Sequence, residues 1–185
     1  MTMPRFREMY SLRSGDLAWD EVKLSVVIPA YNEIDTVEIL LKAVRQVRLS
    51  LEVIVVDDGS TDGTRDLLTR LEKEGLIDVL VFQEVNKGKG AALRAGFQRA
   101  TGDIIAVQDA DLEYDPNDYA AVVAPIQRGE TRVVYGSRVL NRSNEYPTDL
   151  FRVGSFVVTW TANILYGCRL TDEPTCYKAF DRKLL

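Results

Sequence analysis

Apolar and polar residues alternate along most of this chain in a way that predicts strands separated by helices. Five short runs of apolar, mostly β-branched residues are typical of buried strands; they span residues 24–28, 52–56, 78–82, 104–108 and 132–136. Apolar residues at helical spacing predict helices that begin near residue 37, around residues 67–71, and at residues 90–100 and 117–127. Continuous apolar strands separated by such helices predict a mostly parallel sheet in one α/β layered domain.

The chain is expected to fold as a single domain that follows a short extension. A length of 185 residues suits one domain with a sizeable core. Residues 1–23 lack the apolar core of a signal peptide and are interpreted as an N-terminal extension. We expect residues 24–185 to form the domain, and no stretch approaches the roughly 18 apolar residues of a membrane span.

Composition and charge exclude several classes of function. A content of 46% hydrophobic and 28% charged residues is ordinary for a soluble globular protein. The 23 basic and 28 acidic residues give a net charge of −5, which argues against a nucleic acid as partner. Histidine is absent, which excludes Ser-His and Cys-His nucleophiles and His-ligated zinc. Cys168 and Cys176 are expected to be reduced thiols of a cytosolic protein.

Polar residues follow each of the five predicted strands. The segments are "PAYNE", "DDGSTDGT", "EVNKGKG", "DADLE" and "GSR", in chain order. One such segment could be no more than a helix cap. Because ligands of parallel sheets bind beyond the carboxyl ends of the strands, five polar ends on one rim predict a binding site.

The acidic segment after the fourth strand has the chemistry of a metal site. Asp109 and Asp111 flank Ala110, so alternation points both carboxylates the same way. With Glu113 they offer the hard oxygen ligands that suit Mg²⁺ or Mn²⁺, which would relieve the repulsion between the carboxylates. The alternative interpretation is an acidic turn screened by water.

Two other strand ends are suited to a nucleotide. Asp57 and Asp58 end the second strand, where carboxylates can accept hydrogen bonds from a base or a ribose. Lys89 lies between two glycines at a predicted helix start and can reach a phosphate. The "GKG" segment lacks the Walker spacing, and no G-x-G-x-x-G follows the first strand, which disfavours an ATPase or a nicotinamide enzyme.

Six segments taken together resemble a known family. "VVIPAYNE", "VIVVDDGSTDGT", "NKGKGAALRAGF", "DADLEYDP", "VVYGSR" and "LTDEPTCYKAF" look like family 2 glycosyltransferases of the GT-A fold. Within that family they are most similar to dolichol-phosphate mannose synthases and related polyprenyl-phosphate glycosyltransferases. The resemblance implies a GT-A type, Rossmann-like layered domain. It also implies inverting transfer of a hexose from a nucleotide-diphospho sugar, of the GDP-mannose or UDP-glucose type, to a polyprenyl or dolichyl phosphate.

The resemblance also implies roles for individual residues. The nucleotide would contact Pro29, Tyr31, Glu33, Asp57, Asp58, Lys89 and Asp109. The Mg²⁺ or Mn²⁺ on the diphosphate would be held by Asp109 and Asp111, with Glu113 as a further ligand. The acceptor phosphate would be bound by Arg138, Arg152 and Ser155, and the catalytic residues would be Asp111, Arg138 and Asp172. Arginine suits this purpose because its planar guanidinium binds phosphate in a bidentate manner.

The acceptor and the role of Asp172 remain open at this level. A phosphate acceptor is already an anion and needs no strong base, whereas a saccharide hydroxyl, as in cell-surface polysaccharide synthesis, would need one, with Asp172 as the candidate. The alternative interpretation of Asp172 is a turn carboxylate or a partner of Arg169 or Lys178. A non-catalytic nucleotide-sugar binding domain is a further alternative. The residues after Asp111 disfavour an aspartyl phosphatase. The absence of a glycine-rich loop after the first strand disfavours a sugar nucleotidyltransferase.

An apolar segment in the last third of the chain raises the question of contact with a membrane. Residues 151–167 are apolar for much of their length and predict either a helix packed on the sheet or an interfacial helix beside a lipid acceptor. Proteins of the family usually continue past "CYKAF" into further helices and sometimes membrane spans, so we expect this chain to be truncated at its C-terminus. The expected location is cytoplasmic, peripheral at the cytoplasmic face of the membrane.

Overall fold

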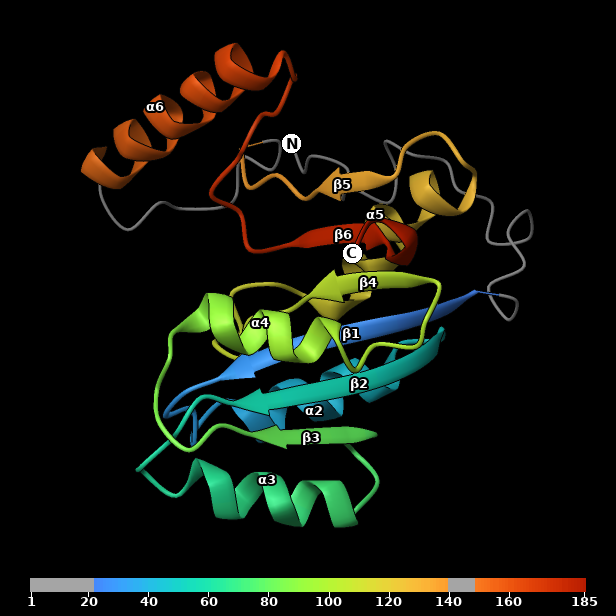
Figure 1. Ribbon diagram of the computed structural model, residues 1–185, viewed down its shortest axis with the longest axis vertical. Helices are drawn as coiled ribbons and strands as arrows, with labels where there is room; N and C mark the ends of the chain where they lie inside the picture. Colours follow the sequence, from blue (N-terminus) through green and yellow to red (C-terminus); the bar gives the residue numbers. More distant parts are fainter. Residues whose placement is uncertain (1–21, 140–148) are drawn as a thin grey trace, which may run out of the picture.

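The computed structural model contains the predicted α/β domain, built on one six-stranded sheet (Figure 1). It describes residues 22–139 and 149–185, apart from the side chains of residues 149–152. The sheet order is β3-β2-β1-β4-β6-β5. The strands are β1 (Lys23–Ala30), β2 (Ser50–Asp57), β3 (Val79–Phe82), β4 (Ile104–Val107), β5 (Val133–Tyr135) and β6 (Lys178–Asp181). The five predicted strands are confirmed.

Helices cover both faces of the sheet. They are α2 (Val37–Gln46), α3 (Thr64–Lys73), α4 (Lys89–Phe97), α5 (Tyr119–Gln127) and α6 (Asp149–Tyr166), with the 3₁₀ turns η2 (Pro116–Asp118) and η3 (Arg182–Leu184). The larger core cluster joins one face of the sheet to α2, α3 and α5. A smaller cluster lies under α4 on the other face. Gly96 permits this close packing, because a Cβ there would lie 2.3 Å from Val27 Cγ1.

The sequence interpretation missed β6, which is antiparallel to both of its neighbours. It pairs with β4 on one side and β5 on the other, so those two strands are not adjacent. Its four residues, KAFD, hold only two apolar residues between two charged ones, so no longer apolar run reveals the strand. Because β6 runs against the other strands, its amino end lies at the edge where their carboxyl ends meet. The segment before β6 therefore reaches the predicted binding rim.

Helix α6 does not pack on the sheet, contrary to one of the two interpretations of this segment. It extends beyond the β5 and β6 side of the sheet (Figure 1). Its large apolar side chains are exposed, whereas the hydroxyl of Thr159 is buried and accepts a hydrogen bond from the Glu173 amide at 3.0 Å. Among the described residues, no helix combines the length and the apolar content that crossing a bilayer requires.

A buried carboxylate joins β1 and β2 at the opposite edge of the sheet. Glu52 accepts hydrogen bonds from Lys23 Nζ at 2.8 Å and from the Thr101 amide at 2.7 Å, and it also binds the Ser25 hydroxyl. Burial by itself would raise the pKa of Glu52, but these hydrogen bonds outweigh it and lower the pKa to about 2. Glu52 therefore stabilises the fold above its unfolded pKa of 4.5, and this contribution is lost as the pH falls towards 2.

We expect Glu52→Gln to lower the free energy of unfolding at pH 7 by roughly 3 kcal/mol, because the amide lacks the negative charge whose hydrogen bonds hold the pKa of Glu52 at about 2. The variant should also lose part of the decrease in stability between pH 4.5 and 2 that the wild type shows. Urea denaturation at a series of pH values measures both effects. Glu72→Gln, at an exposed position of α3, is the matched control. Parallel pH profiles for the wild type and Glu52→Gln would contradict the assignment.

Candidate functional site

A pocket of about 310 Å³ opens at the carboxyl ends of β1, β2 and β4. Six of the seven residues predicted to contact a nucleotide line this pocket, and so does Asp111. The lining residues are Pro29, Ala30, Tyr31, Glu33, Asp58, Asn86, Gly88, Lys89, Asp109, Ala110 and Asp111. The fold thus gathers side chains from three strand ends and the start of α4, as expected for a parallel sheet.

Asp57 is the predicted nucleotide contact that does not line the pocket. Its side chain is fully buried and accepts hydrogen bonds from Arg65 Nε at 3.0 Å and Nη2 at 2.8 Å. Asp58 lines the pocket, and its Oδ1 accepts a hydrogen bond from the Lys87 amide at 2.9 Å. Asp57 thereby anchors the start of α3, and Asp58 joins the end of β2 to the loop before α4.

The loops after β1 and β2 hold each other in place. Asn32, in the left-handed region at φ 57°, donates its amide hydrogen to Ser60 Oγ at 2.9 Å. Its side-chain oxygen accepts a hydrogen bond from the Thr61 amide at 2.9 Å. The Glu33 amide donates to Thr64 Oγ1, also at 2.9 Å. Asparagine tolerates this backbone conformation better than most residues, so the "PAYNE" segment can turn sharply beside the pocket.

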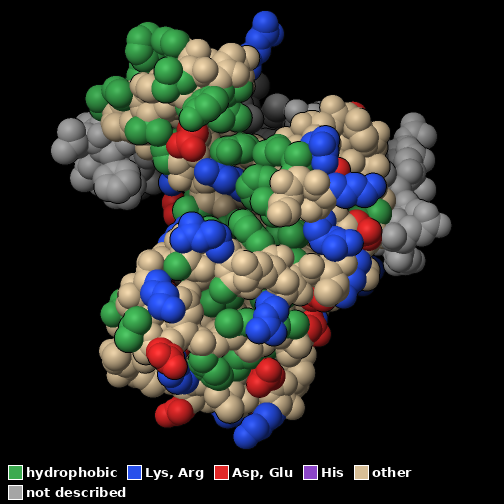
Figure 2. All heavy atoms as spheres, in the orientation of Figure 1, with side chains coloured by type: hydrophobic (Ala, Val, Ile, Leu, Met, Phe, Trp, Pro, Cys, Tyr) green, Lys and Arg blue, Asp and Glu red, His purple; other side chains and the backbone are tan. Residues whose placement is uncertain are grey.

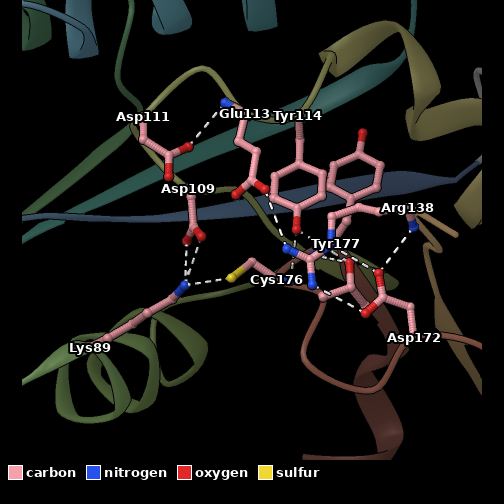
Figure 3. A network of polar contacts seen from close by, with 10 residues as sticks. Lys89, Asp109, Asp111, Glu113, Tyr114, Arg138, Asp172, Cys176 and Tyr177 are labelled. Carbon is pink, nitrogen blue, oxygen red and sulfur yellow. Dashed lines mark hydrogen bonds and ion pairs between the residues drawn. The ribbon is translucent and has the colours of Figure 1, made fainter. Parts of the chain in front are cut away.

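Asp109 and Asp111 both face the pocket, as their spacing predicts. Asp111 Oδ1 accepts a hydrogen bond from the Glu113 amide at 3.0 Å, which closes a tight turn around Leu112 at φ 64°. Asp109 is bound by Lys89, whose Nζ lies 2.6 Å from Oδ1 and 2.7 Å from Oδ2 (Figure 3). The two carboxylates are therefore held in place by different partners.

The donor set fits a divalent cation that shares its coordination with a ligand. Within residues 22–139 and 153–185, no three acidic or thiol side chains converge on one point. Asp109 and Asp111 offer two hard oxygen ligands towards the pocket, and Mg²⁺ in proteins commonly takes its remaining ligands from water and phosphate. The predicted further ligand, Glu113, is instead engaged by Arg138 Nη1 at 3.3 Å.

Lys89 has a second partner that sequence reasoning did not link to it. Its Nζ donates a hydrogen bond to Cys176 Sγ at 2.9 Å. Burial works against the charge on Lys89, but the bonds to Asp109 and Cys176 outweigh it and raise the pKa of the ammonium. Burial and a hydrogen bond to Asp109 raise the pKa of the Cys176 thiol. The ammonium therefore stays charged between the end of β4 and the start of β6.

Arg138 and Asp172, both predicted to be catalytic, form a buried bidentate ion pair. Arg138 Nε lies 2.9 Å from Oδ2 of Asp172, and Nη2 lies 3.1 Å from Oδ1. The Arg138 amide donates to Oδ2 as well, at 3.0 Å. The hydrogen bond to Asp172 raises the pKa of Arg138 despite burial. The suggested pairing of Asp172 with Lys178 does not occur, since Lys178 lies 3.7 Å from Glu173 instead.

Comparison with known proteins identifies the family. The model of glycosyl transferase family 2 matches residues 25–185. This chain belongs to glycosyl transferase family 2. The predicted resemblance is therefore confirmed.

Two curated relatives carry names that refer to polyprenyl phosphates. Undecaprenyl-phosphate 4-deoxy-4-formamido-L-arabinose transferase of Pseudomonas fluorescens (strain Pf0-1) is 36% identical over 156 residues, which cover 80% of this chain and 45% of that protein. Dodecaprenyl-phosphate galacturonate synthase of Rhizobium johnstonii is 34% identical over 169 residues, covering 89% and 49%. The chain thus spans about half the length of these curated relatives.

Solved structures of this enzyme class confirm the GT-A fold. Glucosyl-3-phosphoglycerate synthase from Mycobacterium tuberculosis, in complex with Mn²⁺, UDP and glucosyl-3-phosphoglycerate, superimposes with a TM-score of 0.68 at 27% identity. The match covers 100% of this chain and 64% of that one. The mannosyltransferase PcManGT from Pyrobaculum calidifontis, in complex with GDP-Man and Mn²⁺, gives a TM-score of 0.62 at 25% identity, covering 92% and 48%.

Behind the acidic turn of this family 2 domain lies an aromatic stack that sequence reasoning missed. Tyr114 stacks on Tyr177 with ring centroids 5.3 Å apart, and Tyr119 stacks on the same ring at 5.7 Å. The Tyr119 hydroxyl donates to Gln108 Oε1 at 3.0 Å, and Gln108 Nε2 donates to the Asp109 carbonyl at 3.0 Å. The stack therefore fixes the turn against the segment before β6. Its signal in the sequence is limited to the three tyrosines of "DLEYDP", "NDYAA" and "CYKAF".

The predicted acceptor-phosphate clamp is described only in part. Arg138 lies beside Glu113 at the rim, and Ser155 is half-buried on α6. The side chain of Arg152 lies outside the described residues.

Proposed function

We propose that this chain is the catalytic part of a metal-dependent inverting glycosyltransferase. It would move a sugar from a nucleotide-diphospho sugar, of the GDP-mannose or UDP-glucose type, to a polyprenyl phosphate. The observation that carries the proposal is the convergence of Asp109, Asp111 and Lys89 in one pocket at the strand ends. The names of the relatives support the acceptor, and the Mn²⁺ and nucleotide complexes of the structural neighbours support the donor and the cofactor.

Different residues of the pocket would bind the diphosphate and the nucleoside of the donor. Asp109 and Asp111 would hold Mg²⁺ or Mn²⁺, which supplies positive charge to the leaving diphosphate when bound. Lys89 adds a second positive charge at the start of α4, which has no side-chain cap and whose backbone amides also favour an anion. Tyr31, Glu33 and Asp58 line the pocket near the β1 and β2 ends, the side suited to the nucleoside.

The Arg138–Asp172 pair favours a phosphate acceptor over a saccharide hydroxyl. Both carboxylate oxygens of Asp172 accept hydrogen bonds from Arg138, and the side chain is fully buried. A carboxylate committed in this way is poorly placed to remove a proton from an incoming hydroxyl. Arg138 in turn is oriented towards the acidic turn, where its guanidinium can bind a phosphate anion that needs no base.

Helix α6 provides a surface for the lipid part of such an acceptor. Its large apolar side chains are 48% to 80% exposed; they are Val153, Phe156, Val157, Val158, Trp160, Ile164, Leu165 and Tyr166. Figure 2 shows them as a hydrophobic cluster on α6 at the upper left of the molecule. Residues 153–166 contain no charged side chain, and aromatic residues with polar tips suit a membrane interface. We therefore place this face of the helix against lipid, peripheral to the membrane.

The donor half of the proposal is tested by thermal shift with UDP, GDP, CDP and ADP, each with and without Mn²⁺. We expect one diphosphate with Mn²⁺ to stabilise the protein by about 2.7 kcal/mol at a hundred times its dissociation constant. Asp111→Asn should lose the Mn²⁺-dependent part, because one of two carboxylate ligands is gone. Asp66→Asn, at an exposed position of α3, should behave as the wild type does. If none of the four nucleotides stabilises the wild type, the proposal is wrong.

A further inference from the structure

Lys89 takes the place of a cation on Asp109. Its ammonium contacts both carboxylate oxygens, at 2.6 Å and 2.7 Å (Figure 3). The Asp109 side chain is only 13% exposed, so water reaches little of it. The negative charge of Asp109 is therefore neutralised by another side chain of the same protein.

The same ammonium is held from the other side by the segment before β6. Cys176 Sγ accepts its hydrogen bond at 2.9 Å, and the thiol itself bonds to Asp109. The Tyr114 hydroxyl accepts a hydrogen bond from the Cys176 amide at 3.2 Å, which fixes the position of the cysteine relative to the turn. Lys89 thus lies in a small cradle made of Asp109 and Cys176.

A divalent cation and this ammonium would compete for Asp109. The ammonium contacts both oxygens, so a divalent cation on either of them would lie close to it, and the two positive charges would repel in a partly buried site. Asp111 can also act as a ligand of the cation. In the described part of the chain it bonds to the Glu113 amide, whereas Lys89 pairs with Asp109. Lys89 has a flexible stem and is 45% exposed, so it can leave Asp109 and stay in the pocket.

We propose that Lys89 is an internal counter-ion of Asp109 that competes with the divalent cation and transfers to the diphosphate when the nucleotide binds. The inference rests on the proposed metal and nucleotide site. Its consequence is that metal and nucleotide binding are coupled. The metal alone must break the ion pair between Lys89 and Asp109 without replacing it. When a diphosphate binds with the metal, the ammonium of Lys89 gains a new anionic partner. Nucleotide and metal then bind far better together than apart.

The test measures Mn²⁺ binding by electron paramagnetic resonance, with no nucleotide present, in the wild type and in Lys89→Met. We expect Lys89→Met to bind Mn²⁺ alone roughly tenfold more tightly, because the competing charge is gone. With saturating Mn²⁺, the same variant should bind UDP, or GDP if the thermal-shift panel selects it, roughly tenfold more weakly. Damage to the fold would weaken both, so the opposite signs are diagnostic.

Three controls keep the result decisive. Lys87→Met removes an exposed positive charge from the same loop and should leave Mn²⁺ binding unchanged. Lys89→Arg keeps the charge and should resemble the wild type for Mn²⁺ alone, and Lys89→Gln serves as a second neutral variant if Lys89→Met folds poorly. Suppose that the wild type binds Mn²⁺ together with the nucleotide. If the neutral variants then bind Mn²⁺ alone no more tightly than the wild type does, this inference is wrong but the proposed metal site stands. A wild type that binds no Mn²⁺ in either condition overturns the proposed metal site as well.

Discussion

Asp172→Asn is expected to lower the rate of sugar transfer to undecaprenyl phosphate by roughly 10²- to 10³-fold, the cost of about 3–4 kcal/mol for breaking a buried ion pair at a charge-binding site. The substitution sets an amide against the guanidinium of Arg138 and removes the negative charge that orients it. Binding of the nucleotide with Mn²⁺ should be little affected, because Asp172 does not line the donor pocket. Initial rates at varied acceptor, with nucleotide affinity from thermal shift, separate the two effects.

Arg138→Lys distinguishes a positioning role of Asp172 from that of a general base. If Asp172 acts through Arg138, the lysine variant should lose a comparable factor, since it keeps the charge but not the bidentate geometry. If Asp172 removed a proton from a hydroxyl, Arg138→Lys would retain most of its activity and only Asp172→Asn would be inactive. Glu173→Gln, next in the chain and paired only loosely with Lys178, is the matched control.

The double substitution Trp160→Ser with Ile164→Ser is expected to weaken binding to vesicles of phosphatidylcholine by roughly a hundredfold or more. Each of these exposed side chains would bury apolar surface in lipid, and a large apolar side chain contributes about 1.5–3 kcal/mol. Vesicle flotation measures the partitioning directly. Because residues 153–166 carry no charge, binding by the wild type should change little between low and high salt.

The control for α6 is a pair of substitutions at apolar residues with similar exposure elsewhere. Ile39 on α2 is 57% exposed and Val85 is 60% exposed, so Ile39→Ser with Val85→Ser removes comparable surface away from α6. This control should bind vesicles as the wild type does. Equal binding by both double variants would contradict the assignment of α6 to lipid. Association of the wild type with itself in the absence of vesicles would indicate that a second copy covers this face.

Much of the donor pocket could be predicted because its residues follow strands that are evident from local patterns. Uninterrupted apolar runs such as β2 identify buried strands without knowledge of their neighbours. Once the strands are parallel, their carboxyl ends must meet at one edge, so Asp58, Asp109 and Asp111 converge. The side on which Asp109 and Asp111 lie follows from alternation alone.

Other features depend on contacts between residues far apart in the chain. Asp57 and Asp58 are adjacent and chemically identical, yet one is buried against Arg65 and the other lines the pocket. Strand β6 has only two apolar residues between charged ones, so its sequence does not mark it as a strand, and its position depends on pairing with β4 and β5. Without that pairing, nothing in the sequence places Asp172 beside Arg138 or Cys176 beside Lys89.

The amino-acid sequence therefore suffices for the fold class, the family and the chemistry of the strand ends, because local periodicity and short motifs encode them. The partner of each charged side chain is settled only by the fold. Lys89 binds Asp109, Asp172 is committed to Arg138, and α6 turns its apolar face outward. A sequence pattern shows that a side chain is acidic or apolar, but pairing depends on distances of a few ångströms between segments that only tertiary packing brings together.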